Sequence, residues 1–293
     1  MKSTSTAKEV KALNRYEVSQ IAEVFEISRS SIYYEPVSQE EIGMPRHYQK
    51  SDDQIILEEI KAVIAIRATY GYRRVTTMVN RQRSLDGRNK INRKRVQRIM
   101  RMNGLSLPQT MPQPKRPHTG VVMTMFPNLR WCSDGMEIRC FNGDKVFVAF
   151  ALDCCDREAF AYVARTEPLS ATDIEELMVK AVEARFGESL RCPREIQWLS
   201  DRGSIYRAKS VKDLGKELNL NCCYTRAYSP ESNGMAEAFV KTIKRDYVYQ
   251  ADCDSAETVL KLLPQWFADY NNIAPHSALG MKSPVEYKGS VNF

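Results

Sequence analysis

Short apolar runs in the second half of the chain predict β-strands. Five such runs are rich in β-branched and aromatic residues and end in polar or turn residues. They cover residues 129–139, 145–153, 159–164, 195–200 and 221–224. Longer segments with apolar residues three and four apart predict helices over residues 172–186, 208–218 and 256–270, and around Glu237. Three strands followed by alternating helices and strands predict an α/β domain with a mixed five-stranded sheet over residues 121–293.

The first part of the chain has only helical periodicity. Residues 1–16 are polar and are expected to lack regular structure, and Ile21, Val24 and Phe25 follow at the spacing of one helix face. Ser28 is a candidate N-cap for a second short helix. Residues 1–45 therefore predict either a short helix-turn-helix or a helical hairpin that packs on its neighbour, followed by a linker from Pro36 to Pro45.

Three longer helices are predicted over residues 46–107. The first follows Ser51-Asp52-Asp53, the second follows the break at Gly71, and the third runs from near Asn92 to the stop signal at Asn103-Gly104. Their expected inner faces are Ile55, Ile56, Ile60, Val63 and Ile64; Val75, Met78 and Val79; and Val96, Ile99 and Met100. Four prolines in residues 106–120 predict an extended linker, and the domain boundary is placed at residues 108–120.

Charge distinguishes this helical region from the remainder of the chain. Residues 67–101 contain twelve Lys and Arg but a single acid, Asp86, whereas the whole chain has a net charge of only +7. A solvated helix face normally mixes both signs, so this excess predicts binding to DNA phosphates. The candidate DNA-binding residues are Arg73, Arg74, Arg93, Lys94, Arg95, Arg98 and Arg101.

Composition excludes several other classes of protein. No apolar run is long enough for a transmembrane helix, and the polar N-terminus has no apolar segment typical of a secretory signal. A cytoplasmic protein is the expectation. The eight cysteines include two adjacent pairs and no C-x-x-C spacing, so we expect reduced thiols that pack as small apolar side chains.

Three carboxylates carry the candidate chemistry. Asp134 follows the apolar start of one strand, Asp201 ends another, and Glu237 lies early in a helix, with 35 residues between Asp201 and Glu237. Such an all-oxygen ligand set suits Mg²⁺, with Mn²⁺ as a substitute. Two ions so held can activate an attacking oxygen and stabilise a leaving oxygen at phosphorus.

These motifs resemble the retroviral-integrase-like Asp-Asp-Glu recombinases, and in particular the OrfB-type transposases of two-frame insertion sequences. The similarity covers roughly residues 50–290. It rests on the three carboxylates with their neighbouring residues, on Gly71-Tyr72-Arg73-Arg74, and on a segment from Tyr270-Asn271-Asn272 to Ser283-Pro284. Many members have Asn at the position of Arg202 and Thr at that of Met136, which leaves the carboxylates unaffected.

The resemblance implies a ribonuclease-H-like integrase catalytic core that is preceded by a helix-turn-helix DNA-binding region. It implies metal-dependent cleavage at the ends of an element in double-stranded DNA, followed by joining of the freed 3′-hydroxyl to target DNA. It also implies a multimer on DNA, and an upstream-frame protein (OrfA) as partner or fusion. Two alternatives stay open: a ribonuclease-H-like nuclease without strand transfer, and a catalytically silent DNA-binding repressor derived from a transposase.

The helix of Glu237 has further candidate contacts. Lys241, Lys244 and Arg245 share the face of Glu237, whereas Ala236, Val240, Ile243 and Tyr247 form a second face toward the core. We expect the three cations to bind DNA phosphates, and the preceding loop over residues 228–234 to close on substrate. Pairing of Glu237 with Lys241 explains only part of this track.

Two other groups are interpreted as structural. Asp153 and Asp156 flank Cys154-Cys155 at a strand end, where a turn role with Arg157 is favoured over metal binding. His276 lies in a Pro-containing turn, and no general base is needed in the implied chemistry.

Overall fold

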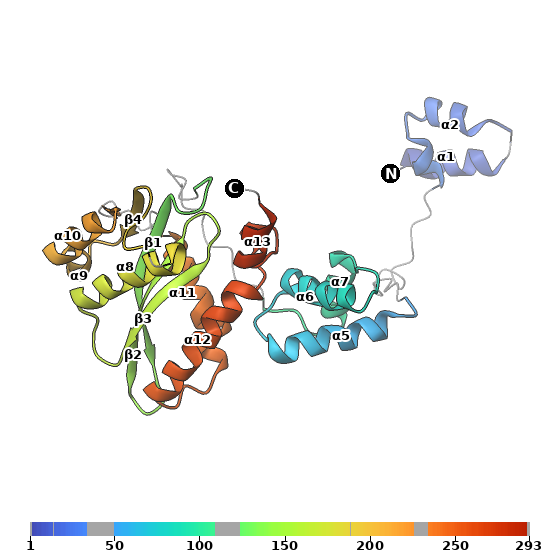
Figure 1. The fold of residues 1–293 in the computed structure, drawn as a ribbon. Coiled ribbons are helices and arrows are strands. Elements are labelled where there is room, and N and C mark those ends of the chain that lie inside the picture. Colours follow the sequence, from blue (N-terminus) through green and yellow to red (C-terminus); the bar gives the residue numbers. More distant parts are fainter. Residues whose placement is uncertain are drawn as a thin grey trace. The chain divides into compact units, whose positions relative to one another are not determined.

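The computed structural model describes residues 2–13, 15–33, 50–108, 124–187, 189–225 and 234–291. The chain divides into two compact units, residues 1–52 and 53–293. Figure 1 shows the elements of each unit. Three predicted segments lie wholly or largely outside the described residues: the linker from Pro36 to Pro45, the linker over residues 106–120 and the loop over residues 228–234.

The first unit contains three short helices: α1 (Lys2–Ala12), α2 (Val18–Val24) and α3 (Arg29–Tyr33). The expectation that residues 1–16 lack regular structure is wrong, because α1 packs the fully buried Ala7 against Ile21 and Ile32. Val24 was expected inside but is 78% exposed. The predicted cap is confirmed, since Ser31 N–H donates to Ser28 Oγ at 3.3 Å.

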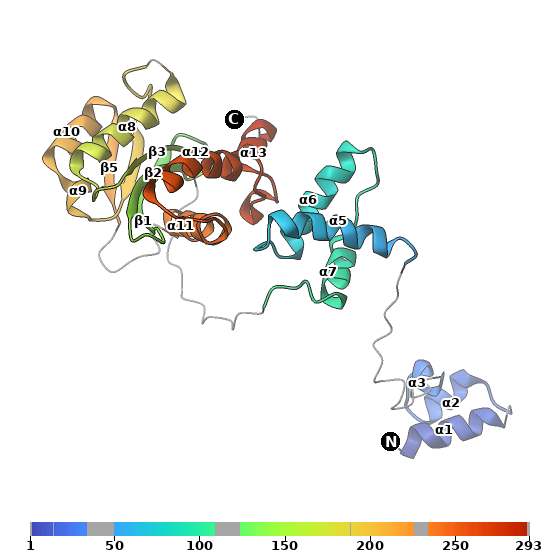
Figure 2. The same cartoon turned by 90° about the horizontal axis from the view of Figure 1, so that it is seen from below.

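A three-helix module opens the second unit. It consists of α5 (Asp53–Ile66), α6 (Tyr72–Leu85) and α7 (Arg93–Met102), which lie together in both views of the fold (Figure 2). The predicted inner residues are largely confirmed, but Ile55 is 59% exposed and Leu57 takes its place inside. At the start of α7, Lys94 N–H donates to the Asn92 side chain at 2.9 Å, and Gly104 follows its end with a φ of 67°.

The sheet contains all five predicted strands. They are β1 (Arg130–Arg139), β2 (Lys145–Asp153), β3 (Ala159–Arg165), β4 (Ile196–Ser200) and β5 (Leu220–Tyr224), in the spatial order β3-β2-β1-β4-β5. The first three pair antiparallel, whereas β4 pairs parallel with both β1 and β5. This mixed sheet confirms the predicted fold class, a ribonuclease-H-like core preceded by helices.

Helices cover both faces of the sheet, because successive strand residues point to opposite sides. On one face α8 (Ala171–Phe186), α9 (Ser204–Arg207) and α10 (Lys209–Glu217) pack with Trp131, Ala149 and Trp198. On the other face α11 (Gly234–Asp246) and α12 (Ala256–Asn272) pack with Phe150 and Leu152. The helix predicted over residues 208–218 is confirmed as α10, which begins after extended backbone at Ala208, whereas the short α9 before it was not predicted.

The C-terminal segment contains one more helix, α13 (Pro284–Ser290), after two 3-10 turns, η2 (Val248–Gln250) and η3 (Ser277–Leu279). No helix of the described residues is both long and apolar enough to span a bilayer. All eight cysteines are free thiols, six of them buried, as expected for small apolar side chains.

Ion pairs connect the three-helix module to the α/β core within the second unit. Arg67 pairs with Asp269 of α12, and Arg81 pairs with Glu286 of α13. Arg74 lies 2.7 Å from Asp246 at the end of α11, and the side chain of Thr69 also donates to Asp246 at 2.6 Å. Asp246 and Asp269 are largely buried, and a buried carboxylate without a partner destabilises the fold. These contacts provide the partners.

Candidate active site and DNA-contacting residues

Asp134 and Asp201 lie side by side because of strand register. Strands β1 and β4 are parallel, with Trp131 opposite Trp198 and Cys132 opposite Leu199. Continuing this register by two residues places Asp134 beside Asp201, which directly follows β4. Cys132 and Met136 point into the cluster that includes α11, and strand alternation directs Asp134 to the same face.

Electrostatics show that the three predicted carboxylates share one region. The pKa of Asp134 is raised to about 6, first by burial and then by the negative charges of Asp201 and Glu237. A hydrogen bond from Gly135 N–H to Asp134 Oδ1, 2.8 Å long, acts in the opposite direction. The structure therefore brings Glu237 within electrostatic reach of the two aspartates.

Asp201 is held by the residues that follow it. Gly203 N–H donates to Asp201 Oδ1 at 2.8 Å. A Cβ at position 203 would lie 2.9 Å from that same oxygen, closer than carbon and oxygen tolerate. The glycine in the Asp-Arg-Gly-Ser sequence thus lets the backbone fold back against the carboxylate.

Glu237 lies near the start of α11 and is 43% exposed at its side chain. The opposite face of α11 is buried through Ala236, Phe239 and Ile243. The predicted inner face was nearly complete: it included the half-buried Val240 and the buried Tyr247 but omitted Phe239. Burial of this face orients Glu237 away from the apolar core.

Each carboxylate has a local partner. Asp134 and Asp201 accept backbone hydrogen bonds, and Glu237 Oε2 lies 3.7 Å from Lys241 Nζ. Within the ranges that the structure describes, no three His, Cys, Asp or Glu side chains form a group tight enough to hold a metal ion. Like charges repel, which accounts for a separated arrangement, but six carboxylate oxygens remain a donor set that fits a hard divalent cation.

Tyr206 supports this site and was not singled out from the sequence. Its ring is 4% exposed, and its hydroxyl lies 3.0 Å from the Oγ of Ser133, the residue before Asp134. Burial raises the pKa of Tyr206, and the charges of Asp134 and Asp201 add to this effect. The sequence signal that could have identified Tyr206 is its place in Asp-Arg-Gly-Ser-Ile-Tyr, close behind Asp201.

The cations of the three-helix module differ in how they are used. Of the twelve Lys and Arg in residues 67–101, seven pair with acids: Arg67, Arg74, Arg81, Arg83, Arg88, Arg95 and Arg98. Glu59 binds Arg83 and Arg88, and Asp53 binds Arg95 and Arg98. Three of the seven predicted DNA-binding residues here, Arg74, Arg95 and Arg98, are thus neutralised within the protein.

Five cations of the module have no ion pair with any described acid: Arg73, Lys90, Arg93, Lys94 and Arg101. All five are exposed. Lys94 and Arg101 are seven residues apart on α7, so they share one face of that helix. The inner face, Val96, Ile99 and Met100, is buried in the module.

The three predicted cations of α11 also divide into those that pair with an acid and those that do not. Lys241 pairs with Glu237, and Arg245 Nε lies 2.7 Å from Asp246. Lys244 lines a cavity of about 730 Å³ together with Glu137, Phe141 and Tyr249. Of these three, Lys244 alone forms no ion pair with the acids that the structure describes.

The remaining carboxylates and the histidine have structural environments. Asp153 accepts backbone hydrogen bonds from Cys155 and Asn128, each 2.7 Å long. Asp156 pairs with Arg185 of α8 at 3.2 Å, and the expected turn role with Arg157 is confirmed, because Arg157 N–H donates to the Asp153 carbonyl at 3.0 Å. Burial lowers the pKa of His276 to about 4, which leaves the ring neutral at pH 7 beside the carbonyl of Tyr270.

Comparisons with known proteins identify related sequences and one similar solved structure. Integrase core domain models match residues 126–230 and 218–284, and an HTH-like domain model matches residues 50–112. Transposase InsD for insertion element IS2A/D/F/H/I/K of Escherichia coli is 43% identical over 272 residues, which cover 92% of this chain and 90% of that protein. Transposase InsD for insertion element IS2-9 of E. coli strain K12 is 43% identical over the same length, with 92% and 88% covered. A simian T-cell lymphotropic virus intasome, solved in complex with PP2A regulatory subunit B56 gamma, gives a TM-score of 0.49 at 14% identity, with 80% of this chain and 76% of that chain covered.

Proposed function

This chain belongs to the family of insertion-element transposases with an integrase core domain, and from that premise we propose that Asp134, Asp201 and Glu237 are its catalytic, metal-binding residues. The family makes it a DNA-cleaving and strand-transferring enzyme. The proposal adds the chemical class: a polynucleotidyl transferase of the Asp-Asp-Glu type that uses one carboxylate site for both steps.

One observation carries the assignment. The pKa of the Asp134 carboxyl is raised first by burial and then by Asp201 and Glu237, although the three residues lie within β1, directly after β4 and in α11. Bringing like charges together costs free energy unless a cation or a proton compensates them. Such a cost is typical of a functional site.

The donor set fits Mg²⁺, with Mn²⁺ as a substitute, because carboxylate oxygens are hard ligands. Asp134, Asp201 and Glu237 would hold the metal, and we propose two ions. Bound there, a pair of divalent cations would activate the attacking oxygen and stabilise the leaving oxygen at phosphorus.

The protein residues supply position. Gly203 fixes the backbone after Asp201 through its hydrogen bond to that carboxylate. Ser133 fixes the backbone before Asp134 through its contact with the Tyr206 hydroxyl. We propose that the buried face of α11 directs Glu237 toward the two aspartates. A phosphodiester bound there would therefore meet oxygens that are already oriented.

DNA recognition is assigned to the exposed cations of the three-helix module. We propose that Arg73, Arg93, Lys94 and Arg101 contact DNA, because no described acid neutralises them. Arg74, Arg95 and Arg98 instead stabilise the fold through Asp246 and Asp53. Lys244 is retained as a phosphate contact beside α11.

Two partner proposals follow from the reaction. An element has two ends, so a multimer would present one carboxylate site to each end. The upstream-frame protein (OrfA) is proposed as a partner or fusion that adds contacts outside this chain.

The test is an assay for joining with labelled DNA that carries the inverted repeats flanking the gene. With Mg²⁺ we expect shortened products from cleavage and longer products from strand transfer, and chelation should abolish both. Shortened products alone would favour the nuclease alternative, and binding without any cleavage would favour the repressor.

A further inference from the structure

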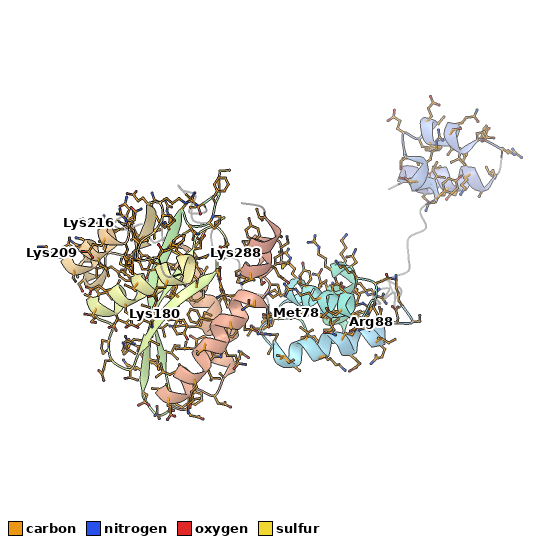
Figure 3. The ribbon with its side chains drawn as sticks, in the orientation of Figure 1. Met78, Arg88, Lys180, Lys209, Lys216 and Lys288 are labelled. Carbon is orange, nitrogen blue, oxygen red and sulfur yellow. The ribbon has the colours of Figure 1, made fainter. Side chains whose placement is uncertain are left out.

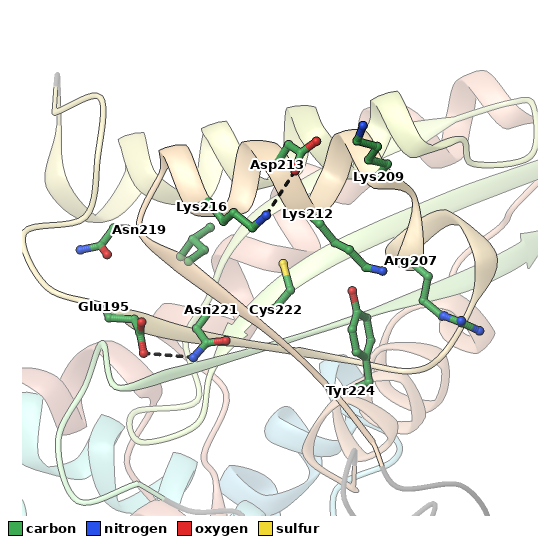
Figure 4. Close-up of a pocket in the computed structure, with 11 residues that line it drawn as sticks. Glu195, Arg207, Lys209, Lys212, Asp213, Lys216, Asn219, Asn221, Cys222 and Tyr224 are labelled. Carbon is green, nitrogen blue, oxygen red and sulfur yellow. Dashed lines mark hydrogen bonds and ion pairs between the residues drawn. The ribbon is translucent and has the colours of Figure 1, made fainter.

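A groove separate from the carboxylates lies between α10 and the edge strand β5. We call it the α10 groove; its volume is about 670 Å³. Figure 4 shows Lys209, Lys212 and Lys216 on the helix side and Tyr224 on the strand side. Arg207 lies at the same end of the groove as Tyr224.

The lining is basic along its whole helix side. Lys209, Lys212 and Lys216 are spaced three and four residues apart, so they share one face of α10. Lys216 lies 3.4 Å from Asp213, an exposed pair worth little. Arg207, Lys209 and Lys212 form no ion pair with an acid in the described part of the chain, and the groove's other acid, Glu195, accepts a hydrogen bond from Asn221 at 3.0 Å.

One end of the groove lies beside the end of β4, which Asp201 follows, whereas α10 covers the face of the sheet opposite to α11. Strand β5 pairs parallel with β4, so Tyr224 lies opposite Ser200, the residue before Asp201. The Tyr224 hydroxyl donates to the carbonyl of Tyr206 at 3.1 Å, and the Tyr206 hydroxyl in turn contacts Ser133 beside Asp134. Tyr206 therefore contacts both one end of the groove and the backbone beside the proposed active site.

The length of the groove matches a short piece of DNA strand. At about 3.3 Å per strand residue, the four steps of β5 span about 13 Å. A strand of DNA has one phosphate per about 3.4 Å of helix axis, so about four phosphates lie along that distance. Three cations of the groove, Arg207, Lys209 and Lys212, have no ion pair with a described acid, so each can meet one of these phosphates.

We propose that the α10 groove binds the sugar–phosphate backbone of a DNA strand that continues from the carboxylate site. The proposal rests on the proposed function and adds a second DNA contact to it. The strand belongs either to the element or to the target, because both supply the same phosphates. Contacts of this kind hold DNA in register without reading its sequence.

The experiment measures binding by the full-length chain, with a chelator present so that no reaction occurs. The probes are two fluorescent duplexes, one with the inverted repeat that flanks the gene and one of unrelated sequence. Anisotropy is followed against salt concentration for Lys209→Ala/Lys212→Ala. The matched control is Lys180→Ala/Lys261→Ala, which removes two lysines from α8 and α12 that already pair with Glu176 and Glu257. Figure 3 shows Lys180 and Lys209 on their separate helices.

We expect the log–log salt slope of the groove variant to fall by about 1.8, because each lost phosphate contact removes about 0.9. A fall with the repeat duplex alone assigns the groove to element DNA, a fall with the unrelated duplex alone assigns it to target DNA, and a fall with both assigns it to either. The control and the charge-retaining Lys209→Arg/Lys212→Arg should keep the original slope.

An unchanged slope with both probes would overturn the proposal. So would an equal fall in the Lys209→Arg/Lys212→Arg variant, because that result would mean a structural role for the two lysines. The readout needs no catalysis, so an inactive wild-type protein would count against the proposed function and leave this result independent.

Discussion

Asp134 is the residue whose charge depends most on the fold. On a free chain its carboxyl would have a pKa near 3.9, whereas burial and the neighbouring Asp201 and Glu237 raise the pKa to about 6. The context of each carboxylate in the sequence was sufficient to select all three residues. The partners of Arg74 and Arg67 were not predictable, because Asp246 and Asp269 are 172 and 202 residues away.

The raised pKa predicts that Asp134→Asn stabilises the protein when divalent metal is chelated. A group with a raised folded pKa favours folding below its unfolded pKa and loses that contribution as pH rises through the folded pKa. At pH 8 the wild type therefore has the full cost of the ionised carboxylate, and the variant should gain about 1–3 kcal/mol in free energy of unfolding. The gain should vanish between pH 6 and 4.

Urea unfolding at both ends of that pH range measures the effect, with Asp252→Asn at an exposed position as the control. A less stable Asp134→Asn variant at pH 8 would mean that the carboxylate is not strained by its neighbours.

At the scale of elements, local signals were strong where caps and apolar spacing agreed. Helix α7 follows its Asn92 cap, stops before Gly104, and buries the three residues predicted. Polar α1 was missed because its stability comes from docking Ala7 against α2 and α3 rather than from its own sequence pattern. The short α9 was missed because its four residues are too few to show a helical spacing of apolar residues.

Helix α7 also predicts a division of labour between its cations. Lys94→Ala/Arg101→Ala should lower the salt slope of DNA binding by about 1.8 and leave the melting temperature unchanged. Arg95→Ala/Arg98→Ala removes the same charge but leaves Asp53 without these partners, so it should lower the melting temperature. Equal loss of salt slope in both double variants would contradict the division.

At the scale of the whole molecule, the three-helix module offers fewer unpaired positive charges than its composition suggests. Ion pairs with α11, α12 and α13 neutralise three of its arginines and join it to the α/β core. A fragment that ends near residue 107 would lack Asp246, Asp269 and Glu286, the acids that pair with these arginines. DNA binding is therefore best measured on the full chain.

The proposed function depends on one site assembled from distant segments. The sequence could select the three candidate carboxylates and predict the strands, because both signals are local. It could not predict the free cations of α7, because long-range pairing decides which charges remain available. The α10 groove depends likewise on the placement of α10 against β5.

The most direct test of the central claim is single-turnover cleavage and joining by amide variants of the three carboxylates with Mg²⁺. We expect Asp134→Asn, Asp201→Asn and Glu237→Gln each to lose both steps, by at least about a thousandfold, while DNA binding is retained. The matched controls are Asp252→Asn and Glu257→Gln, exposed acids of the same core, and both should keep wild-type rates. Near-normal cleavage by Asp201→Asn would contradict the assignment of the active site.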